Sequence, residues 1–395
     1  MRALVVAPQP FFTPRGTPFS VYYRTLVASE LGLKIDLLTY GEGMDVDIPG
    51  VRIIRIPHPR ILRNVKVGPS YSKLLLDILL FFRAVALMAS EKYDIVHAHE
   101  EAVFFCEFLK PFFGYKLIYD MHSSLSQQLT NFQFTSSQVL IGLFSLLEKR
   151  ALRHADAVIT ICPDLAEQAC SVMRNCTKHF LIENSIFEPV RLSSASSQKG
   201  KLAEDQVPDP ESLPAGRALL VYAGTLEPYQ GLDILIPAFQ IVQAEEPRAL
   251  LLIVGGTPPQ VAYYQSLAER CGISEHVLFT GRVSPELAKR YCAKATLLLS
   301  PRSGGSNTPL KIYEQLASGI PLVATRVHSH TQVLTDEVAF LVDPEPEDMA
   351  QGILTALRSH DSRKRIAEKA QCLYQMKYSR PVYVGKLKRL LESLR

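Results

Sequence analysis

The sequence of 395 residues lacks any run of about eighteen charge-free apolar residues, the length that a membrane-spanning helix needs. The stretch from Leu74 to Met88 comes nearest, but Asp77 and Arg83 interrupt it. The apolar run at the start of the chain ends at Pro8 and is too short for a signal peptide. We therefore expect a first β-strand there, and neither a membrane span nor a secretory leader.

Cysteine and net charge are also sparse. The seven cysteines are odd in number and form no CxxC pair, which favours a reducing cytoplasmic compartment and argues against a zinc site. The net charge of +4 is too small and too dispersed to indicate nucleic acid binding. A hydrophobic content of 47% is typical of a globular protein, and the length suffices for two domains.

The dinucleotide fingerprint Gly-x-Gly-x-x-Gly is absent after the first strand, where Gly16 and Pro18 instead open a helix. Strand and helix patterns then alternate, with one stretch rich in serine and proline that lacks apolar periodicity. This order predicts an α/β protein with two Rossmann-like domains facing a central cleft. The predicted parts are an N-terminal domain at 1–190, a flexible linker or insertion at 191–216, a second domain at 217–376, and a C-terminal helix at 377–395 that crosses back to the first domain.

The stretch from Ser300 to Thr325 reads as a strand, a glycine-rich turn and a helix. Thr308 is the predicted N-cap, with Pro309 at the first helical position and Gly319 closing the helix. The first turn of such a helix leaves backbone N–H groups unpaired, here those of Leu310 and Lys311, and the helix dipole adds positive charge. A phosphate can bind there.

Charged side chains near this turn suggest how a ligand would be held. Arg302 and Lys311 can add full positive charges, whereas a carboxylate would repel phosphate, so Glu314 is assigned to sugar hydroxyls. The alternative is that Glu314 only favours the helix and that Lys311 is a solvated surface charge.

Polar residues also end two strands of the first half, where parallel sheets bind ligands. His97 and His99 share one sheet face, and Asp120 and His122 follow the next strand. Histidines so placed could suggest a metal, but no motif fixes a carboxylate partner, and we expect none.

Taken together, these motifs resemble the GT-B glycosyltransferases of family 4, retaining enzymes that move a sugar from a nucleotide-sugar. The resemblance covers nearly all the chain except 191–216. It is carried by Gly16, Asp120-Met121-His122, Glu148, Gly224, Gln230-Gly231, Gly255-Gly256, Gly281-Arg282 and the run from Pro309 to Glu314.

The resemblance implies a hexosyltransferase that uses a UDP- or GDP-sugar without a metal or other cofactor, for example in cell-envelope polysaccharide biosynthesis. The acceptor would be a glycan or a lipid-linked molecule. His122 and Asp120 would act at the donor sugar, His122 by bonding to a hydroxyl. The implied donor-binding residues are Gly16, Gly224, Gln230, Gly256, Arg282, Arg302, Ser306, Asn307, Thr308, Leu310, Lys311 and Glu314.

Three positions depart from the family pattern. Thr225 and Gln230 stand where an arginine and a lysine commonly contact the donor diphosphate, and Ser306 replaces the first of two glutamates. Each lost cation removes a charge-assisted bond of about 1.5 to 3 kcal/mol. Arg302, Lys311 and Arg282 could supply the missing positive charge instead. The alternatives are a non-catalytic relative that binds a nucleotide-sugar, or a sugar-nucleotide epimerase on the same fold.

Basic residues beside apolar segments lead us to expect peripheral contact with the inner face of a membrane. The alternative is that a helix apolar on all sides is buried between a sheet and its neighbours. The residues concerned are the run 74–83, the cluster Phe104, Phe105, Phe108, Phe112 and Phe113, and the cations Arg60, Arg63, Lys66, Lys73, Lys110 and Lys116.

Overall fold

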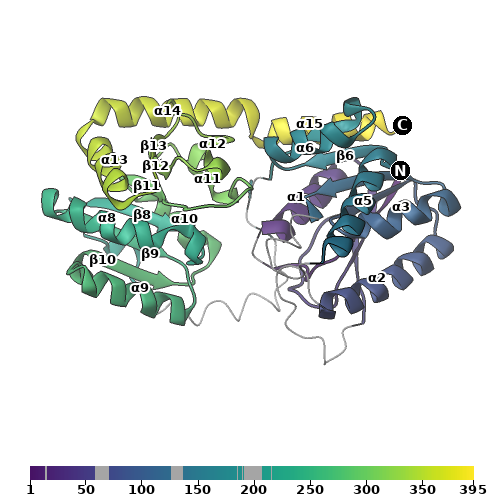
Figure 1. The fold of residues 1–395 in the computed structure, drawn as a ribbon, viewed down its shortest axis with the longest axis horizontal. Coiled ribbons are helices and arrows are strands. Elements are labelled where there is room, and N and C mark those ends of the chain that lie inside the picture. Colours follow the sequence, from purple (N-terminus) through teal and green to yellow (C-terminus); the bar gives the residue numbers. More distant parts are fainter. Residues whose placement is uncertain are drawn as a thin grey trace. The chain divides into compact units, whose positions relative to one another are not determined.

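The computed structural model describes residues 1–13, 16–57, 71–125, 137–184, 186–188, 190, 207–214 and 216–395. The chain divides into two compact α/β units, each built around one parallel sheet (Figure 1). Unit 1 comprises Met1–Ile186, Val190–Ser193 and Arg380–Arg395, and unit 2 comprises Phe187–Pro189 and Ser194–Ser379.

The sheet of unit 1 has the order β3-β2-β1-β4-β5-β6-β7, and all its strand pairs are parallel. Its strands are short apolar runs covered on both faces, as expected for parallel sheets. Their bounds are β1 Arg2–Ala7, β2 Lys34–Thr39, β3 Val51–Arg55, β4 Ile95–His99, β5 Lys116–Met121, β6 Ala157–Thr160 and β7 His179–Leu181.

The helices of unit 1 cover both faces of this sheet. Leu4 and Val6 of β1 share a buried cluster with α2, α3, α5 and α6, for example with Leu80 and Val103. The helices α1 and α15 pack together against the other face, where Arg380 forms an ion pair of 2.7 Å with Glu30. The bounds are α1 Gly16–Glu30, α2 Tyr71–Ser90, α3 Ala102–Phe113, α5 Gln138–His154, α6 Pro163–Val172 and α15 Arg380–Ser393.

Unit 2 repeats this plan with the strand order β10-β9-β8-β11-β12-β13, again parallel throughout. Its strands are β8 Ala218–Ala223, β9 Ala249–Val254, β10 Val277–Gly281, β11 Leu297–Ser300, β12 Leu322–Thr325 and β13 Phe340–Val342.

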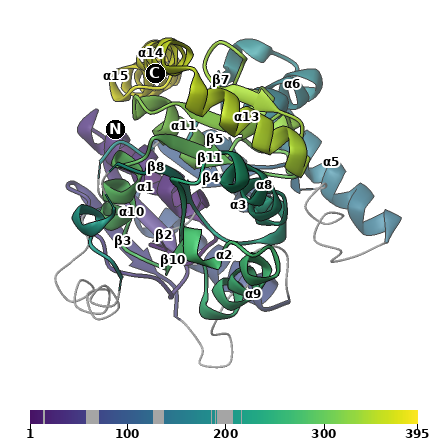
Figure 2. The ribbon, with the colours of Figure 1, turned by 90° about the vertical axis from the view of Figure 1, so that its left-hand side faces the viewer.

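Two buried clusters flank the sheet of unit 2. One joins it to α8 Leu232–Glu245, α9 Pro258–Arg270 and α13 Pro346–Arg358, of which α8 and α13 lie side by side (Figure 2). The other joins it to α10 Pro285–Ala293, α11 Leu310–Ala317 and α14 His360–Lys377, and the single turn α12 spans His328–Thr331.

The strand order reverses direction once in each sheet, between β1 and β4 in unit 1 and between β8 and β11 in unit 2. Loops that leave neighbouring strands at such a point run in opposite directions, which opens a ligand crevice at the carboxyl ends. The segments after β8 and β11 carry most of the predicted site residues, and Asp120 and His122 lie at the end of β5, the neighbour of β4.

The predicted strands and helices are present, with some different boundaries. Helix α3 continues through Pro111 to Phe113. The predicted cap at Thr308 is wrong: Pro309 occupies the N-cap with an extended backbone, and α11 starts at Leu310 without a side-chain cap. The stretch 326–376, for which the sequence pattern predicts no elements, contains α12, β13, α13 and most of α14.

Two further expectations concern the linker and the cysteines. Residues 191–206 and 215 of the predicted linker lie outside the described residues, and its described part contains the short 3₁₀ helix Pro210–Ser212. Cys170 and Cys176 form a disulfide between the end of α6 and the short 3₁₀ helix Cys176–Lys178 that precedes β7. The expectation of fully reduced cysteines is therefore wrong for this pair, whose separation of six residues does not match the CxxC spacing.

Candidate functional site

Lys311, in the first turn of α11, is the centre of a polar cluster in unit 2. Its Nζ lies 3.4 Å from Oε1 of Gln230 and 4.2 Å from the centre of the Tyr222 ring. A Cβ atom built on Gly224 would lie 3.5 Å from the same Nζ. The ends of β8 and β11 therefore bring three predicted donor-binding residues together: Gly224, Gln230 and Lys311.

Arg302 lies in the loop between β11 and α11, and that loop closes around its side chain. Its Nη1 donates to the carbonyl oxygen of Asn307 at 3.2 Å, and its guanidinium carbon lies 5.1 Å from the centre of the Tyr229 ring. Gly305 adopts φ +113°, and a Cβ there would come within 2.4 Å of the guanidinium. The loop therefore packs closely against the side chain of Arg302 and holds it in place.

These two cations have no anionic partner: in the part of the chain that the structure describes, neither forms an ion pair. Burial, followed by the charge of Arg302, lowers the pKa of Lys311 to about 7. Burial also lowers the pKa of Arg302. Since buried positive charge is unfavourable without a counter-charge, the cluster is suited to an anionic ligand.

Gly231 fixes the position of Gln230 in this cluster. Its backbone has φ +77°, and a Cβ atom there would lie 1.9 Å from the carbonyl oxygen of Pro301. Only glycine permits both the left-handed backbone and so close an approach. The turn after β8 therefore packs directly on the segment that leads to Arg302.

The other predicted residues of unit 2 are arranged less closely. Glu314 lies 3.5 Å from Nζ of Lys289, and burial raises the pKa of Glu314. Arg282 is exposed and has no ion pair or side-chain hydrogen bond within the described ranges. The exposed Ser306 accepts a bond from Gln332 through its carbonyl oxygen, and the Oγ1 atom of Thr308 is buried without a bonding partner among the described residues.

A second cluster lies in unit 1 around Asp120, at the end of β5. Its carboxylate is fully buried, and Oδ2 lies 2.9 Å from Nε of Arg24, a buried residue of α1. His97 donates from Nε2 to the same oxygen at 3.0 Å. Burial acts to raise the pKa of Asp120, but Arg24 and then the histidines outweigh it and hold that pKa below its usual range.

His122 joins this cluster through His99. Nδ1 of His99 lies 3.1 Å from Nε2 of His122, so one nitrogen donates and the other accepts, and at least one ring is neutral. Burial lowers the pKa of His122 to about 4 despite the opposing effect of Asp120. Burial also lowers the pKa of His99 well below its usual value.

This geometry separates the roles of the two residues predicted to be catalytic. Asp120 is fully buried and enclosed by Arg24 and the three histidines. His122 is at the edge of the cluster, and the turn that follows it is held by Glu148, whose carboxylate accepts bonds of 3.0 Å from Ser124 and from the backbone of Leu125.

Gly16 starts α1, where a side chain would meet open space.

Sequence reasoning missed several members of these clusters, namely Arg24, Tyr222 and Tyr229. Arg24 lies in the middle of α1 without a local motif, and only tertiary packing brings it to Asp120. The two tyrosines flank the glycine turn after β8, so aromatic residues beside that turn were the available signal.

Two groups of residues have the composition of metal ligands. The ligand atoms of His97, His99 and Asp120 lie within 4.8 Å of one another. However, Oδ2 of Asp120 already forms an ion pair with the guanidinium of Arg24, which balances the negative charge of the carboxylate. Cys170, Cys176 and His179 are also within 4.8 Å, with both sulfurs in the disulfide.

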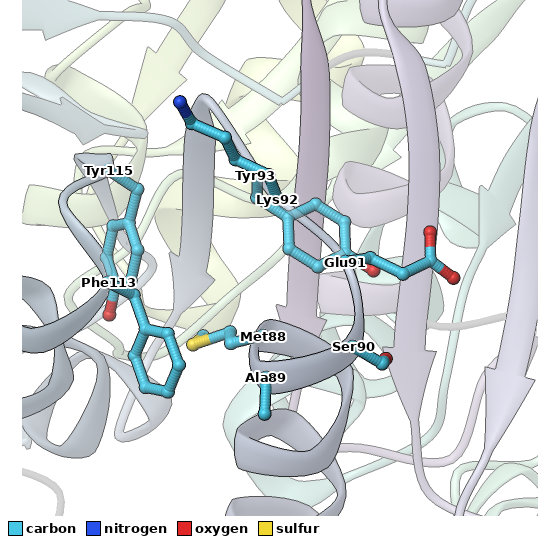
Figure 3. A pocket seen from close by; sticks show the side chains of 8 residues that line it. All are labelled: Met88, Ala89, Ser90, Glu91, Lys92, Tyr93, Phe113 and Tyr115. Carbon is cyan, nitrogen blue, oxygen red and sulfur yellow. The ribbon is translucent and has the colours of Figure 1, made fainter.

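A pocket of about 260 Å³ in unit 1 lies away from the Asp120 cluster (Figure 3). It is lined by residues 88–93, Phe113 and Tyr115, which form the ends of α2 and α3 and the turns that lead to β4 and β5. It therefore opens at the amino ends of these strands, opposite to the edge that carries Asp120. Its lining contributes none of the predicted site residues.

Comparison with known proteins identifies the family. Residues 204–372 match the family described as glycosyl transferases group 1, and residues 22–173 match the glycosyl transferase 4-like domain. The chain belongs to the group 1, family 4-like GT-B glycosyltransferases.

Individual members of this glycosyltransferase family are distant in sequence. The D-inositol 3-phosphate glycosyltransferase of a Nocardioides species is 29% identical over 202 residues, which cover 47% of this chain and 41% of that enzyme. The chain thus spans less than half the length of that relative.

Solved structures of GT-B proteins share the fold across the full chain. Sucrose-phosphate synthase from Thermosynechococcus elongatus is 19% identical, with a TM-score of 0.75, and the match covers 100% of this chain and 98% of that one. HepE from Anabaena in complex with UDP-glucose is 17% identical, with a TM-score of 0.68, covering 100% and 99%.

Proposed function

We propose that this glycosyltransferase moves a hexose from a nucleoside-diphosphate sugar to a lipid-linked or cell-envelope glycan acceptor, with retention of configuration. The observation that carries the proposal is the pair of half-buried cations, Arg302 and Lys311, without carboxylate partners in the described part of unit 2. The HepE complex with UDP-glucose supports a nucleotide-sugar as the ligand.

In this proposal the donor diphosphate binds at the start of α11. The backbone N–H groups of Leu310 and Lys311 and the two cations stabilise its negative charge, which increases as the sugar leaves. Arg302 and Lys311 would then supply the charge that Thr225 and Gln230 do not. Glu314 would accept bonds from sugar hydroxyls, and no metal ion is required.

His122 is the residue that we assign to the chemistry of transfer. Because its pKa lies near 4, its ring is neutral at physiological pH and can bond to a sugar hydroxyl without adding charge. Asp120 and His99 hold the ring in one orientation.

A donor screen tests the proposed function. We expect UDP- or GDP-sugars to raise the melting temperature of the protein, and slow hydrolysis of the preferred donor to release the nucleoside diphosphate. Stabilisation without any turnover would indicate a non-catalytic nucleotide-sugar-binding relative, and release of an epimerised sugar would indicate an epimerase. Absence of stabilisation by every nucleotide-sugar would contradict the proposal.

We also propose that unit 1 contacts a membrane surface. None of the helices among the described residues is long and apolar enough to cross a bilayer. Three neighbouring helices of one layer, α2, α3 and α5, instead expose large apolar side chains. These are Leu74, Leu75, Ile78, Phe82, Phe108, Phe112, Val139, Leu143 and Leu146.

Cations next to this apolar face would favour an anionic bilayer, each contributing about 1 kcal/mol. Arg83 and Lys149 are exposed on α2 and α5. Lys73, Lys110 and Lys116 are already paired with acidic side chains, so they contribute less than the sequence suggests. Arg60, Arg63 and Lys66 lie outside the described residues.

Liposome flotation tests this contact. We expect the protein to float with anionic vesicles at low salt, where electrostatic attraction is strongest. Phe112→Ser, which removes a side chain that is 72% exposed, should reduce flotation several-fold, whereas the control Tyr263→Ser on α9 should not. Wild-type protein that stays unbound at low salt would make a soluble acceptor the better proposal.

A further inference from the structure

Arg24 is a fully buried cation in the middle of α1, and partners from two separate segments fix its guanidinium. Nε lies 2.9 Å from the carboxylate of Asp120 at the end of β5. Nη2 donates to the carbonyl oxygen of Ile182 at 3.0 Å and to Oδ1 of Asn184 at 3.2 Å, both just after β7. The guanidinium is therefore tied to one position with little freedom to move.

The charge of Arg24 determines what Asp120 can do to the histidines around it. A buried carboxylate alone would stabilise a positive charge on any imidazole at hydrogen-bond distance. His97, His99 and His122 all lie within 3.3 Å of its oxygens. Because Arg24 already balances the negative charge, the carboxylate can orient the rings of His99 and His122 as neutral groups.

We propose that Arg24 is a positioning residue for sugar transfer: its ion pair with Asp120 keeps the ring of His122 neutral and fixed in one orientation. This inference rests on the proposed function only in assigning a use to His122. The arrangement itself, a buried cation balancing the carboxylate that orients three imidazoles, follows from the distances in unit 1.

Several charged and titratable groups face this cluster and enter its electrostatics. Arg24 comes from α1, His97 and His99 from β4, Asp120 from β5 and Tyr383 from α15. Glu100, directly after β4, is also near Asp120, but burial raises the pKa of Glu100 to about 7, so its carboxyl is neutral near pH 4, where His122 titrates. Burial lowers the pKa of His122 most, Asp120 raises it, and Arg24 and then His97 lower it, so removal of Arg24 leaves the raising effect of Asp120 unopposed by that cation.

Titration of His122 by NMR tests the inference without any need for activity. Its signal is assigned as the one that is missing in His122→Gln. We expect the wild-type ring to titrate near pH 4. Arg24→Met should raise this value by one unit or more, and Arg24→Lys, which keeps the charge, should raise it less. The matched control is Arg52→Met, which breaks the ion pair of 2.7 Å with Asp36 elsewhere in unit 1 and should leave His122 unchanged.

Kinetics supply the second readout. The acid limb of kcat should move to higher pH in Arg24→Met by the same amount as the His122 titration, while donor KM stays within about threefold. A purely structural role would lower kcat equally at every pH, and that result would overturn the inference. A wild-type His122 that titrates at its ordinary pKa near 6.5 would also overturn the inference. That measurement can be made even if the arginine variants fail to fold. If no sugar is transferred by wild-type protein, the proposed function fails, yet the titration still decides the role of Arg24.

Discussion

Substitution of Lys311 is the perturbation that most directly tests the anion site of unit 2. Its amine lies over the ring of Tyr222 and beside Gln230, without a carboxylate to balance it in the described residues. Lys311→Met removes the charge and keeps most of the apolar side chain. We expect this change to affect donor binding and unliganded stability in opposite directions.

The size of the binding effect follows from one charge-assisted hydrogen bond, about 1.5 to 3 kcal/mol, or a loss of roughly 10- to 150-fold in donor affinity. The pKa of Lys311 is about 7 in the free protein, and a bound diphosphate should raise it again. At pH 7 the wild-type protein should therefore take up about half a proton on binding the donor. Affinity should fall by up to tenfold for each unit of pH above 7.

The expected change in stability has the opposite sign. A lysine whose pKa is lower in the folded state than in the unfolded state makes the folded state bind fewer protons, so stability increases as pH rises from 7 to about 10. The free Lys311→Met protein should then be at least as stable as wild type at pH 7, because it no longer buries a partly charged amine.

Isothermal titration calorimetry with UDP, in buffers of different ionisation enthalpy, measures both the affinity and the number of protons taken up. The matched control is Lys369→Met on α14, whose amine lies 3.1 Å from Glu337 at the surface, and it should behave as wild type. Unchanged affinity and unchanged proton uptake in Lys311→Met would remove this residue from the site. Loss of affinity together with a large loss of stability would show that its role is structural.

Two further predictions concern buried histidines. His122→Ala should lower kcat by tenfold or more while changing nucleotide affinity less than threefold, and equal losses of activity and of thermal stability would instead indicate a structural role. His330 is fully buried, with Nε2 at 3.0 Å from Ser300 and Nδ1 donating to the carbonyl oxygen of Thr325 at 2.8 Å, and burial lowers its pKa to about 4. Because the unfolded state then binds more protons than the folded state, about 3 kcal/mol of stability should be lost as pH falls from 6.5 to 4. The free energy of unfolding of His330→Asn, measured in urea, should depend less on pH than that of wild type. An identical pH dependence in the two proteins would contradict this assignment.

The sequence by itself determined the alternation of strands and helices and hence the two parallel sheets. Runs such as Ala3 to Ala7 and Ala249 to Val254 are continuous and apolar, which a strand buried on both faces requires, and their positions match β1 and β9. The glycine turns and the polar strand ends were also readable, because a parallel sheet places them at one edge.

Local pattern was less reliable where several conformations suit the same residues. Thr308 before Pro309 is a common way to start a helix, yet the extended backbone continues to Pro309 and the helix begins one residue later. Cys170 and Cys176 carry no familiar spacing, and their pairing depends on how the end of α6 approaches β7.

Tertiary structure alone decided the electrostatics of both clusters. No pattern in α1 distinguishes Arg24 from a solvated arginine, and its pairing with Asp120 joins residues 96 positions apart. Likewise, Lys311 was equally readable as a surface charge, and only the packing of the turn after β8 on the loop after β11 leaves it half-buried without a counter-charge among the described residues. The pKa of a side chain depends on the solvent and charges around it in space, and the order of residues along the chain does not specify these.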